Sequence, residues 1–247
     1  MSADEVLVSF DPASVRSQRK VAFVVASTAY GLFRLASKIK VENPENLPQK
    51  TGAIVAAYHA NHLDPVLVGL AVWRNGRLPH FLAKSSLFTG ALGVILKGLG
   101  QIPVLRASAQ AGDSLEYAKE ALRRGEVVVI YPEGTLTKDE GFWPQHFKTG
   151  TARLALETAA PIIPVAHWGL EDVKPRGTKV PRLRPLRHTS VVRFGEPIEY
   201  HDLWQAREEN KSKTILTRRL ANTIATMVGD LSGRDVPHRF MTEEVGE

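Results

Sequence analysis

The stretch "GAIVAAYHANHLDPV" (residues 52–66) contains the pattern that decides the fold. Residues 52–58 are small or apolar and predict a buried strand, which the polar residues after them bring to an end. Asp64 followed by Pro65 is typical of a helix start, with aspartate as the N-cap and proline at the first helical position. His59 therefore falls where a strand ends and Asp64 where a helix begins. In open α/β sheets, ligands bind at such strand-to-helix turns.

Short apolar strands alternate with helical segments along the rest of the chain. Strands are expected at 53–58, 80–84, 102–104, 126–134, 161–168 and 189–198, and helices at 12–38, 65–73, 86–99, 111–124, 151–160 and 206–231. This alternation predicts an α/β fold with a central, mostly parallel or mixed sheet flanked by helices. The turn-rich segment 41–52 predicts a division into an N-terminal helical segment, residues 1–40, and an α/β domain, residues 41–247.

Composition narrows the classes of function. Hydrophobic residues make up 43% of the 247 residues, which is enough for a sizeable core. The absence of cysteine excludes disulfide scaffolds, thiolate zinc sites and cysteine nucleophiles. A net charge of +6 indicates an anionic partner, which could be a phosphorylated substrate, an anionic lipid surface or a nucleic acid. The basic, proline-rich segment 174–187 fits either a solvated loop or a surface that faces a headgroup or a carrier.

An apolar run, "VAFVVASTAYGLF" (21–33), lies between Arg19-Lys20 and Arg34. It is shorter than the roughly 20 residues that a helix needs to cross a bilayer. The run could be a core helix, or an interfacial helix whose flanking cations reach lipid headgroups. We favour the second interpretation and expect residues 1–40 to associate with a membrane peripherally.

His59 and Asp64 form the first candidate site. Five residues of regular helix would place their side chains roughly 140° apart, so they meet only if the chain turns between them. A carboxylate that faces an imidazole orients it and stabilises the imidazolium formed when it accepts a proton. Two other interpretations stay open at this point. Asp64 could merely cap a helix, or His59, His62 and Asp64 could bind a metal, although the H-E-x-x-H spacing of zinc enzymes is absent.

Three further stretches place polar residues at strand ends. "GQIPVLR" brings Arg106 just past a short strand, and "IIPVAHWG" ends a buried strand with His167. "YPEGTLT" places Glu133, Gly134 and Thr135 in a turn whose amides could bind phosphate or a developing oxyanion. Separately, each stretch has an ordinary structural explanation: a surface charge, a core histidine or a simple turn.

Together and in this order, the stretches resemble the four sequence blocks of the glycerophospholipid acyltransferases of the lysophosphatidic acid acyltransferase type. The blocks are His59-Ala-Asn-His-Leu-Asp64, Gly100-Gln-Ile-Pro-Val-Leu-Arg106, Tyr131-Pro-Glu-Gly-Thr-Leu-Thr137 and Ile162-Ile-Pro-Val165. "FLAKSSLF" (81–88) and "FKTGTARLAL" (147–156) are also similar to segments of that family. The resemblance covers roughly residues 20–200.

The resemblance implies acyl transfer from a thioester, either acyl-CoA or acyl-carrier protein, to the free hydroxyl of 1-acylglycerol 3-phosphate. The product would be phosphatidic acid, an intermediate of phospholipid biosynthesis. His59 would be the general base and Asp64 its orienting partner, whereas His62 would have no chemical role. Substrate would be bound by Arg106, Lys84, Glu133, Gly134, Thr135 and Lys148. No metal, cofactor or nucleic acid is implied, and the location implied is the cytoplasmic face of the cell membrane.

The chain departs from the family pattern in its third block. Leu136 stands where the family has arginine, and Thr137 where it has serine, so Arg106, Lys84, Lys148 or Arg153 would have to bind more of the phosphate. The acceptor could therefore be glycerol 3-phosphate, another lysophospholipid or a glycolipid. Two rivals from other classes are a metal-dependent hydrolase and a non-catalytic protein that binds membranes or nucleic acid through its basic surface.

Overall fold

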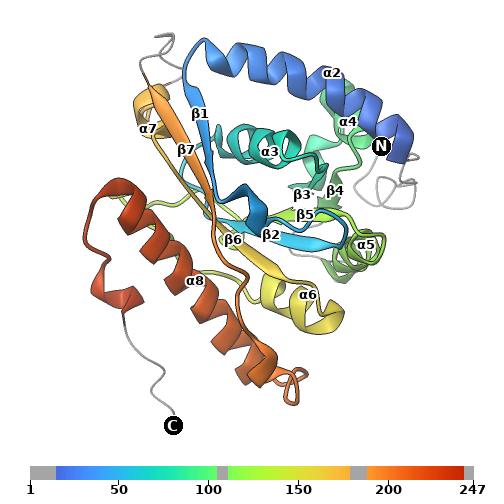
Figure 1. Cartoon of the computed structure of the whole chain (residues 1–247). Coiled ribbons are helices and arrows are strands. Elements are labelled where there is room, and N and C mark those ends of the chain that lie inside the picture. The colour runs from blue at the N-terminus through green and yellow to red at the C-terminus, as the bar shows by residue number, and fades with distance from the viewer. Residues whose placement is uncertain (1–14, 105–110, 179–187, 242–247) are drawn as a thin grey trace.

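The computed structural model describes residues 15–104, 111–178 and 188–241. The described strands form one seven-stranded sheet in the order β1-β7-β6-β2-β5-β3-β4 (Figure 1). Their bounds are β1 Lys38–Glu42, β2 Ala53–Ala57, β3 Pro79–Lys84, β4 Ile102–Val104, β5 Val127–Ile130, β6 Ile162–Trp168 and β7 Thr189–Phe194. Neighbouring strands are parallel except β6 and β7, which are antiparallel. The mixed sheet that the sequence predicts is thus confirmed.

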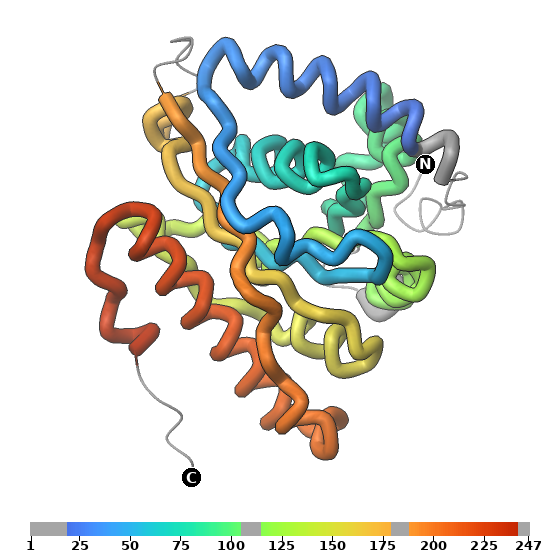
Figure 2. The backbone as a smooth tube through the Cα atoms, viewed as in Figure 1, coloured from blue at the N-terminus to red at the C-terminus, as the bar shows by residue number. Residues whose placement is uncertain are grey.

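Helices cover both faces of the sheet (Figures 1 and 2). Their bounds are α2 Val15–Arg34, α3 Asp64–Arg74, α4 Gly90–Gly98, α5 Ala111–Arg123, α6 Gly150–Thr158, α7 Leu170–Val173 and α8 Asn210–Ser232. One face carries α3, with α2 packed across it and against α4, and the other carries α5, α6 and α8. None of the helices in the described part is both long and apolar enough to cross a membrane.

The central strand β2 explains why the core has two halves. Ala53, Val55 and Ala57 point into the apolar cluster beneath α3, whereas Ile54 and Ala56 point into the cluster beneath α6 and α8. All five residues are fully buried. A parallel strand covered on both faces needs apolar residues at every position, and that is why 52–58 reads as a continuous apolar run.

The N-terminal part differs from the expectation at one element. The expected helix 12–38 ends at Arg34, and Lys38–Glu42 forms the edge strand β1, which pairs with β7. The alternation of lysine with isoleucine and valine in "KIKVE" suits a half-exposed strand, and lysines are common on edge strands. This strand spans the expected boundary at residue 40. The division into an N-terminal segment, 1–40, and an α/β domain, 41–247, stays a prediction.

Candidate active site

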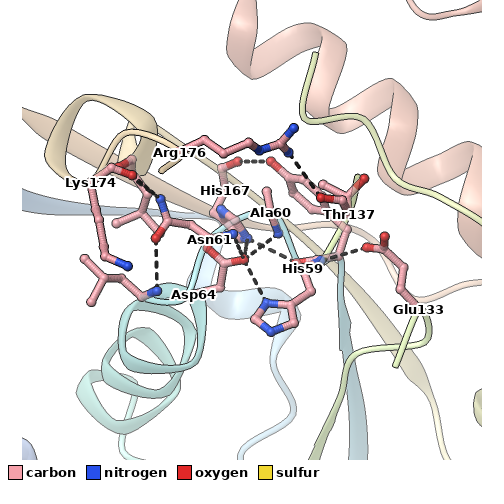
Figure 3. Close-up of polar contacts among 12 residues, drawn as sticks. His59, Ala60, Asn61, Asp64, Glu133, Thr137, His167, Lys174 and Arg176 are labelled. Atoms are coloured by element: carbon pink, nitrogen blue, oxygen red, sulfur yellow. Dashed lines mark hydrogen bonds and ion pairs between the residues drawn. The ribbon is translucent and has the colours of Figure 1, made fainter. Parts of the chain in front are cut away.

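His59 and Asp64 meet at the carboxyl edge of the sheet (Figure 3). His59 follows β2 and Asp64 is the first residue of α3. The chain turns between them, and Nδ1 of His59 lies 3.1 Å from Oδ2 of Asp64. Because an aspartate carboxylate can only accept, Nδ1 donates, and the Nε2 atom keeps its lone pair. The histidine side chain is 20% exposed, so its free nitrogen is available to a substrate hydroxyl.

The sequence suggested that Asp64 caps its helix, but the structure shows that it does not. The N-cap is Leu63, and no side chain caps the first turn of α3. The Oδ2 atom of Asp64 instead accepts the backbone N–H groups of Ala60 at 2.6 Å and Asn61 at 2.7 Å. The buried carboxylate thereby folds the loop that carries His59 back onto the start of the helix. Asn61 fixes this loop further, because its side-chain amide donates to the Lys174 carbonyl at 2.8 Å.

A third residue joins this pair from the adjacent strand. Nε2 of His167, at the end of β6, lies 3.5 Å from Oδ2 of Asp64 and 3.2 Å from the carbonyl oxygen of Tyr58. The rings of His167 and Tyr58 stack with centroids 4.6 Å apart, and the Tyr58 hydroxyl donates to the His167 carbonyl at 2.7 Å. His167 is thus buried, as the core-histidine interpretation expected, but its polar edge contacts the Asp64 carboxylate.

The metal interpretation has no geometric support in the described residues. His62 is exposed, three positions along the loop from His59. Nowhere in residues 15–104, 111–178 and 188–241 do three histidine, aspartate or glutamate side chains converge as they would to hold a metal ion.

Aromatic rings line one side of His59. The ring centroids of Tyr131 and His59 are 4.6 Å apart, and the Phe81 ring stacks on Tyr131 with centroids 6.3 Å apart. Burial raises the pKa of Tyr131 well above 10, with a smaller contribution from the charge of Asp64. Tyr131 is therefore a neutral wall of the site.

Glu133 lies beside the His59 backbone. One carboxylate oxygen accepts the N–H of His59 at 2.8 Å, and the other accepts the N–H of Gln145 at 3.2 Å. Burial raises the pKa of Glu133 to about 7, although these two amides act in the opposite direction. Both oxygens are engaged by the backbone, so this carboxylate positions the loop of His59.

The turn after β5 is anchored to His59 at both ends. Glu133 accepts the His59 N–H, and four residues later the N–H of Thr137 donates to the His59 carbonyl at 2.6 Å. Gly134 has a φ of +69°, and its own N–H closes the turn on the Tyr131 carbonyl. Within the described part of the chain, the N–H groups of Glu133, Thr135 and Leu136 have no acceptor. The free donors of the turn are therefore these three amides and not that of Gly134.

The expected phosphate-binding cations differ in their placement. Lys148 lies over the turn, because a Cβ atom built on Gly134 would be 3.2 Å from its Nζ atom. Lys84 is exposed at the end of β3, with no described contact to His59 or Asp64. Arg153 pairs with Glu157 at 2.7 Å. Arg106 lies outside the described residues.

Arg176 is a neighbour of the site that sequence reasoning missed. It belongs to the basic segment 174–187, of which residues 179–187 are outside the described part. Its guanidinium donates to the Thr137 carbonyl at 3.1 Å (Figure 3). It also donates to the Asp139 carbonyl at 3.0 Å and lies over the Phe142 ring. Only the local excess of positive charge in the sequence pointed to this segment. Thr137, which replaces the serine of the resembled family, donates its hydroxyl to the Trp143 carbonyl and has a structural role.

Relatives with known names are similar to this chain over more than half of its length. A 1-acyl-sn-glycerol-3-phosphate acyltransferase from Bacillus subtilis (strain 168) is 31% identical over 142 residues, which are 56% of this chain and 66% of that protein. A probable 1-acyl-sn-glycerol-3-phosphate acyltransferase from Mycoplasma pneumoniae is 29% identical over 201 residues, 78% of this chain and 73% of that protein. This chain thus spans just under two thirds of the first relative and about three quarters of the second.

The same architecture occurs in a solved structure. The crystal structure of the 1-acyl-sn-glycerophosphate (LPA) acyltransferase PlsC from Thermotoga maritima has a TM-score of 0.68 against this chain at 23% identity. The match covers 95% of this chain and 90% of that one, so the two share a fold. Residues 38–168, more than half of the chain, match the model of the family described as Acyltransferase, and with His59, Asp64 and the Glu133 turn all inside the match, this protein belongs to the Acyltransferase family.

Proposed function

We propose that this protein transfers an acyl chain from a thioester donor to the free hydroxyl of 1-acylglycerol 3-phosphate and makes phosphatidic acid. The observation that carries the proposal is the 3.1 Å contact between Nδ1 of His59 and Oδ2 of Asp64. With Nδ1 donating to the carboxylate, Nε2 accepts the proton of the substrate hydroxyl as its oxygen attacks the thioester carbon. The names of the relatives from Bacillus subtilis and Mycoplasma pneumoniae support this acceptor.

The mechanism needs no acyl-enzyme, because the acceptor oxygen is itself the nucleophile. The oxygen forms a bond to the thioester carbon, the carbonyl becomes an oxyanion, and the thiolate then leaves. The imidazolium of His59 returns its proton to the leaving sulfur. A chain without cysteine can perform every one of these steps.

The free amides of Thr135 and Leu136 are our candidates for stabilising the oxyanion. They lie between Glu133 and Thr137, the two points at which the turn is anchored to the backbone of His59. Donors that are fixed before the reaction stabilise developing charge without reorganising, which typically contributes about 3–4 kcal/mol per donor.

The acceptor phosphate is assigned to the cations around the same turn. Lys148 lies over Gly134. No carboxylate of the described residues pairs with its ammonium group, so this group can bind a phosphate as a point charge. Arg106 and Lys84 stay proposed helpers. Leu136 removes the family's arginine from the turn, so replacing Lys148 is expected to weaken acceptor binding strongly.

An apolar cavity suits an acyl chain. It has a volume of about 260 Å3 and lies between α2, α3, β3 and α4. Pro65 and Phe81 line it, and Phe81 stacks on Tyr131, which in turn contacts His59. The aromatic rings thus connect the cavity with the reacting centre.

We also propose peripheral attachment to the cytoplasmic face of the cell membrane through α2. Phe23, Val24 and Leu32 of this helix are each more than 60% exposed. On the neighbouring α4, Val94 is 72% exposed. Large apolar side chains gathered on two packed helices are typical of a surface that inserts between lipids.

The test uses the full chain purified in detergent with palmitoyl-CoA and a panel of acceptors. The panel contains 1-acylglycerol 3-phosphate, glycerol 3-phosphate, a lysophospholipid with a larger headgroup and no acceptor. Thiol release and lipid product are expected with 1-acylglycerol 3-phosphate, and His59→Ala should lower turnover by about 10²–10⁴-fold. The matched control is His62→Ala, which removes an exposed histidine of the same loop and should retain substantial turnover. Thiol release without an acceptor would instead make the protein a thioesterase and overturn the proposal.

A further inference from the structure

A polar groove begins at the turn after β5 and continues along α8. Its volume is about 1070 Å3. The walls come from the turn after β5, from residues 144–149, from one face of α8 and from the short helix His238–Phe240. Glu133 and Thr135 line the end near His59, and Arg218, Asn222 and Phe240 line the part along α8. The groove therefore starts where the chemistry is proposed and leads away from it.

The charge of the groove favours an anionic ligand. Lys148 and Arg218 line it, and within the described residues neither pairs with a carboxylate. Its two acidic residues are already satisfied: Glu133 accepts backbone amides, and Asp139 accepts from Arg239 at 2.7 Å. Two uncompensated cations thus face this space, and since Lys148 is assigned to the acceptor phosphate, Arg218 is the one left for a second ligand.

The wall formed by α8 is a polar stripe. Thr214, Arg218 and Asn222 follow one another at intervals of four residues, which places them on one side of the helix. Beside the stripe, the Arg239 guanidinium, which also pairs with Asp139 at 2.7 Å, lies over the Phe240 ring, 5.0 Å from its centroid. The stripe offers a guanidinium and an amide, followed by a flat ring surface.

We propose that this groove binds the phosphopantetheine arm of the thioester donor, with Arg218 contacting its phosphate. This inference rests on the proposed acyl transfer. The reaction has four parts to accommodate, and two of them are acyl chains that a polar, charged groove would not hold. The glycerophosphate headgroup is small for 1070 Å3 and is assigned to the turn. The long polar arm of the donor, with its amides, hydroxyl and phosphate, remains.

The arm occurs in two donors, coenzyme A and acyl-carrier protein. In both, the thioester end belongs at Glu133 and Thr135, next to His59. Only coenzyme A continues into an adenine nucleotide, which the Arg239–Phe240 surface could stack upon. Thioesters of coenzyme A, of phosphopantetheine alone and of the carrier protein therefore separate contacts with the arm from contacts with the nucleotide.

The experiment compares Arg218→Ala with Arg219→Ala in the full chain. Arg218 is exposed, so its replacement should not disturb folding. Arg219, the next residue of the helix, faces a different surface, where it pairs with Asp202. We expect Arg218→Ala to raise the KM for palmitoyl-CoA and for palmitoyl-phosphopantetheine about tenfold, which is the loss of one charge-assisted contact. The KM for 1-acylglycerol 3-phosphate should stay constant, and Arg219→Ala should change neither.

Two outcomes would overturn the groove assignment: an unchanged donor KM in Arg218→Ala, or a rise in the acceptor KM in its place. A second readout is independent of turnover, namely calorimetric binding of free coenzyme A to the wild-type protein and to both variants. Weaker binding in Arg218→Ala alone supports the assignment, and equal binding in all three contradicts it. If His59→Ala abolishes acyl transfer while Arg218→Ala leaves the donor KM unchanged, the proposed function stands and only the groove assignment fails.

Discussion

Nε2 of His167 lies 3.5 Å from Oδ2 of Asp64, the same oxygen that Nδ1 of His59 contacts at 3.1 Å. The carboxylate oxygen that contacts His59 is thus also held from the adjacent strand β6. His167 does not touch the proposed substrate, because it is buried and stacked on Tyr58. Its role is that of a positioning residue that fixes Asp64, which in turn fixes His59.

Replacing His167 with phenylalanine tests this role. A phenyl ring preserves the stacking on Tyr58 and removes both the polar contact with Asp64 and the hydrogen bond to the Tyr58 carbonyl. We expect kcat to fall about tenfold with little change in either KM, since one polar interaction contributes about 0.5–1.5 kcal/mol and about 1.4 kcal/mol corresponds to a tenfold change in rate. Steady-state kinetics with both substrates provide the measurement, and unfolding in urea shows whether the fold persists.

His167→Gln provides the companion variant, because an amide can still donate to Asp64. Partial recovery of kcat in His167→Gln relative to His167→Phe is expected. If both variants had the kcat of the wild type, Asp64 would need no support from β6.

Glu133 predicts a dependence of stability on pH. Its pKa is about 7 in the folded protein and 4.5 when the group is unperturbed, chiefly because of burial. Between these values the folded protein retains a proton that the unfolded chain releases, so the free energy of unfolding falls as the pH rises from about 4.5 to about 7. Above pH 7 this contribution is constant.

Glu133→Gln removes the titration. The unfolding free energy of the wild type minus that of this variant should fall as the pH rises from about 4.5 to about 7, as measured by urea denaturation at several pH values. Glu116→Gln is the control, because Glu116 is exposed on α5 and pairs with Lys119. A wild-type curve parallel to that of Glu133→Gln over this range would show that the carboxyl does not titrate there.

Much of the fold could be predicted from the sequence because its strong signals are local. The apolar run before His59 and the run before Tyr131 predicted buried strands, and both are confirmed as β2 and β5. The edge strand β1 could not be found in this way. Its five residues include Lys38, Lys40 and Glu42, and only pairing with β7, some 150 residues later, makes them a strand.

The site was predicted by residue type and only partly by role. Asp64 was identified, yet helix-start statistics suggested an N-cap, and only the fold shows its carboxylate accepting from Ala60 and Asn61. Glu133 was expected to contact substrate, but its oxygens accept backbone amides from segments that the sequence does not place side by side. The contact of His167 with Asp64 depends on β6 lying next to β2, which no local pattern encodes.

The exposed face of α2 predicts how the protein meets lipid. Deleting residues 1–40 would also remove part of β1, so point variants are the sharper test. The double variant Phe23→Glu, Val24→Glu should bind vesicles containing anionic lipid at least tenfold more weakly, because burying each apolar side chain is worth about 1.5–3 kcal/mol. Vesicle co-sedimentation measures the change. Met241→Glu, which alters an exposed apolar residue beyond α8, should bind as the wild type does, and equal binding by the double variant would exclude this face.

The apolar cavity between α2, α3, β3 and α4 predicts that a substitution at one glycine changes which acyl-chain lengths the protein prefers. Gly69 of α3 lines the cavity, and a Cβ atom there would lie 3.3 Å from the Phe81 ring, a contact that a small shift of the ring relieves. In Gly69→Leu the side chain would occupy part of the 260 Å3. We expect the preference among acyl chains to move toward shorter ones, with kcat/KM falling about fourfold for each methylene that is excluded, the equivalent of about 0.8 kcal/mol.

Rates with a series of donors and a series of 1-acylglycerol 3-phosphates from eight to eighteen carbons would reveal which of the two chains the cavity holds. Gly31→Leu is the matched control, because it adds the same side chain to a helix where a Cβ atom would meet nothing within 4 Å. If Gly69→Leu left both chain-length profiles where the wild type and Gly31→Leu have them, neither acyl chain would occupy the cavity. The acyl chains would then lie along the exposed surface of α2 and α4 instead.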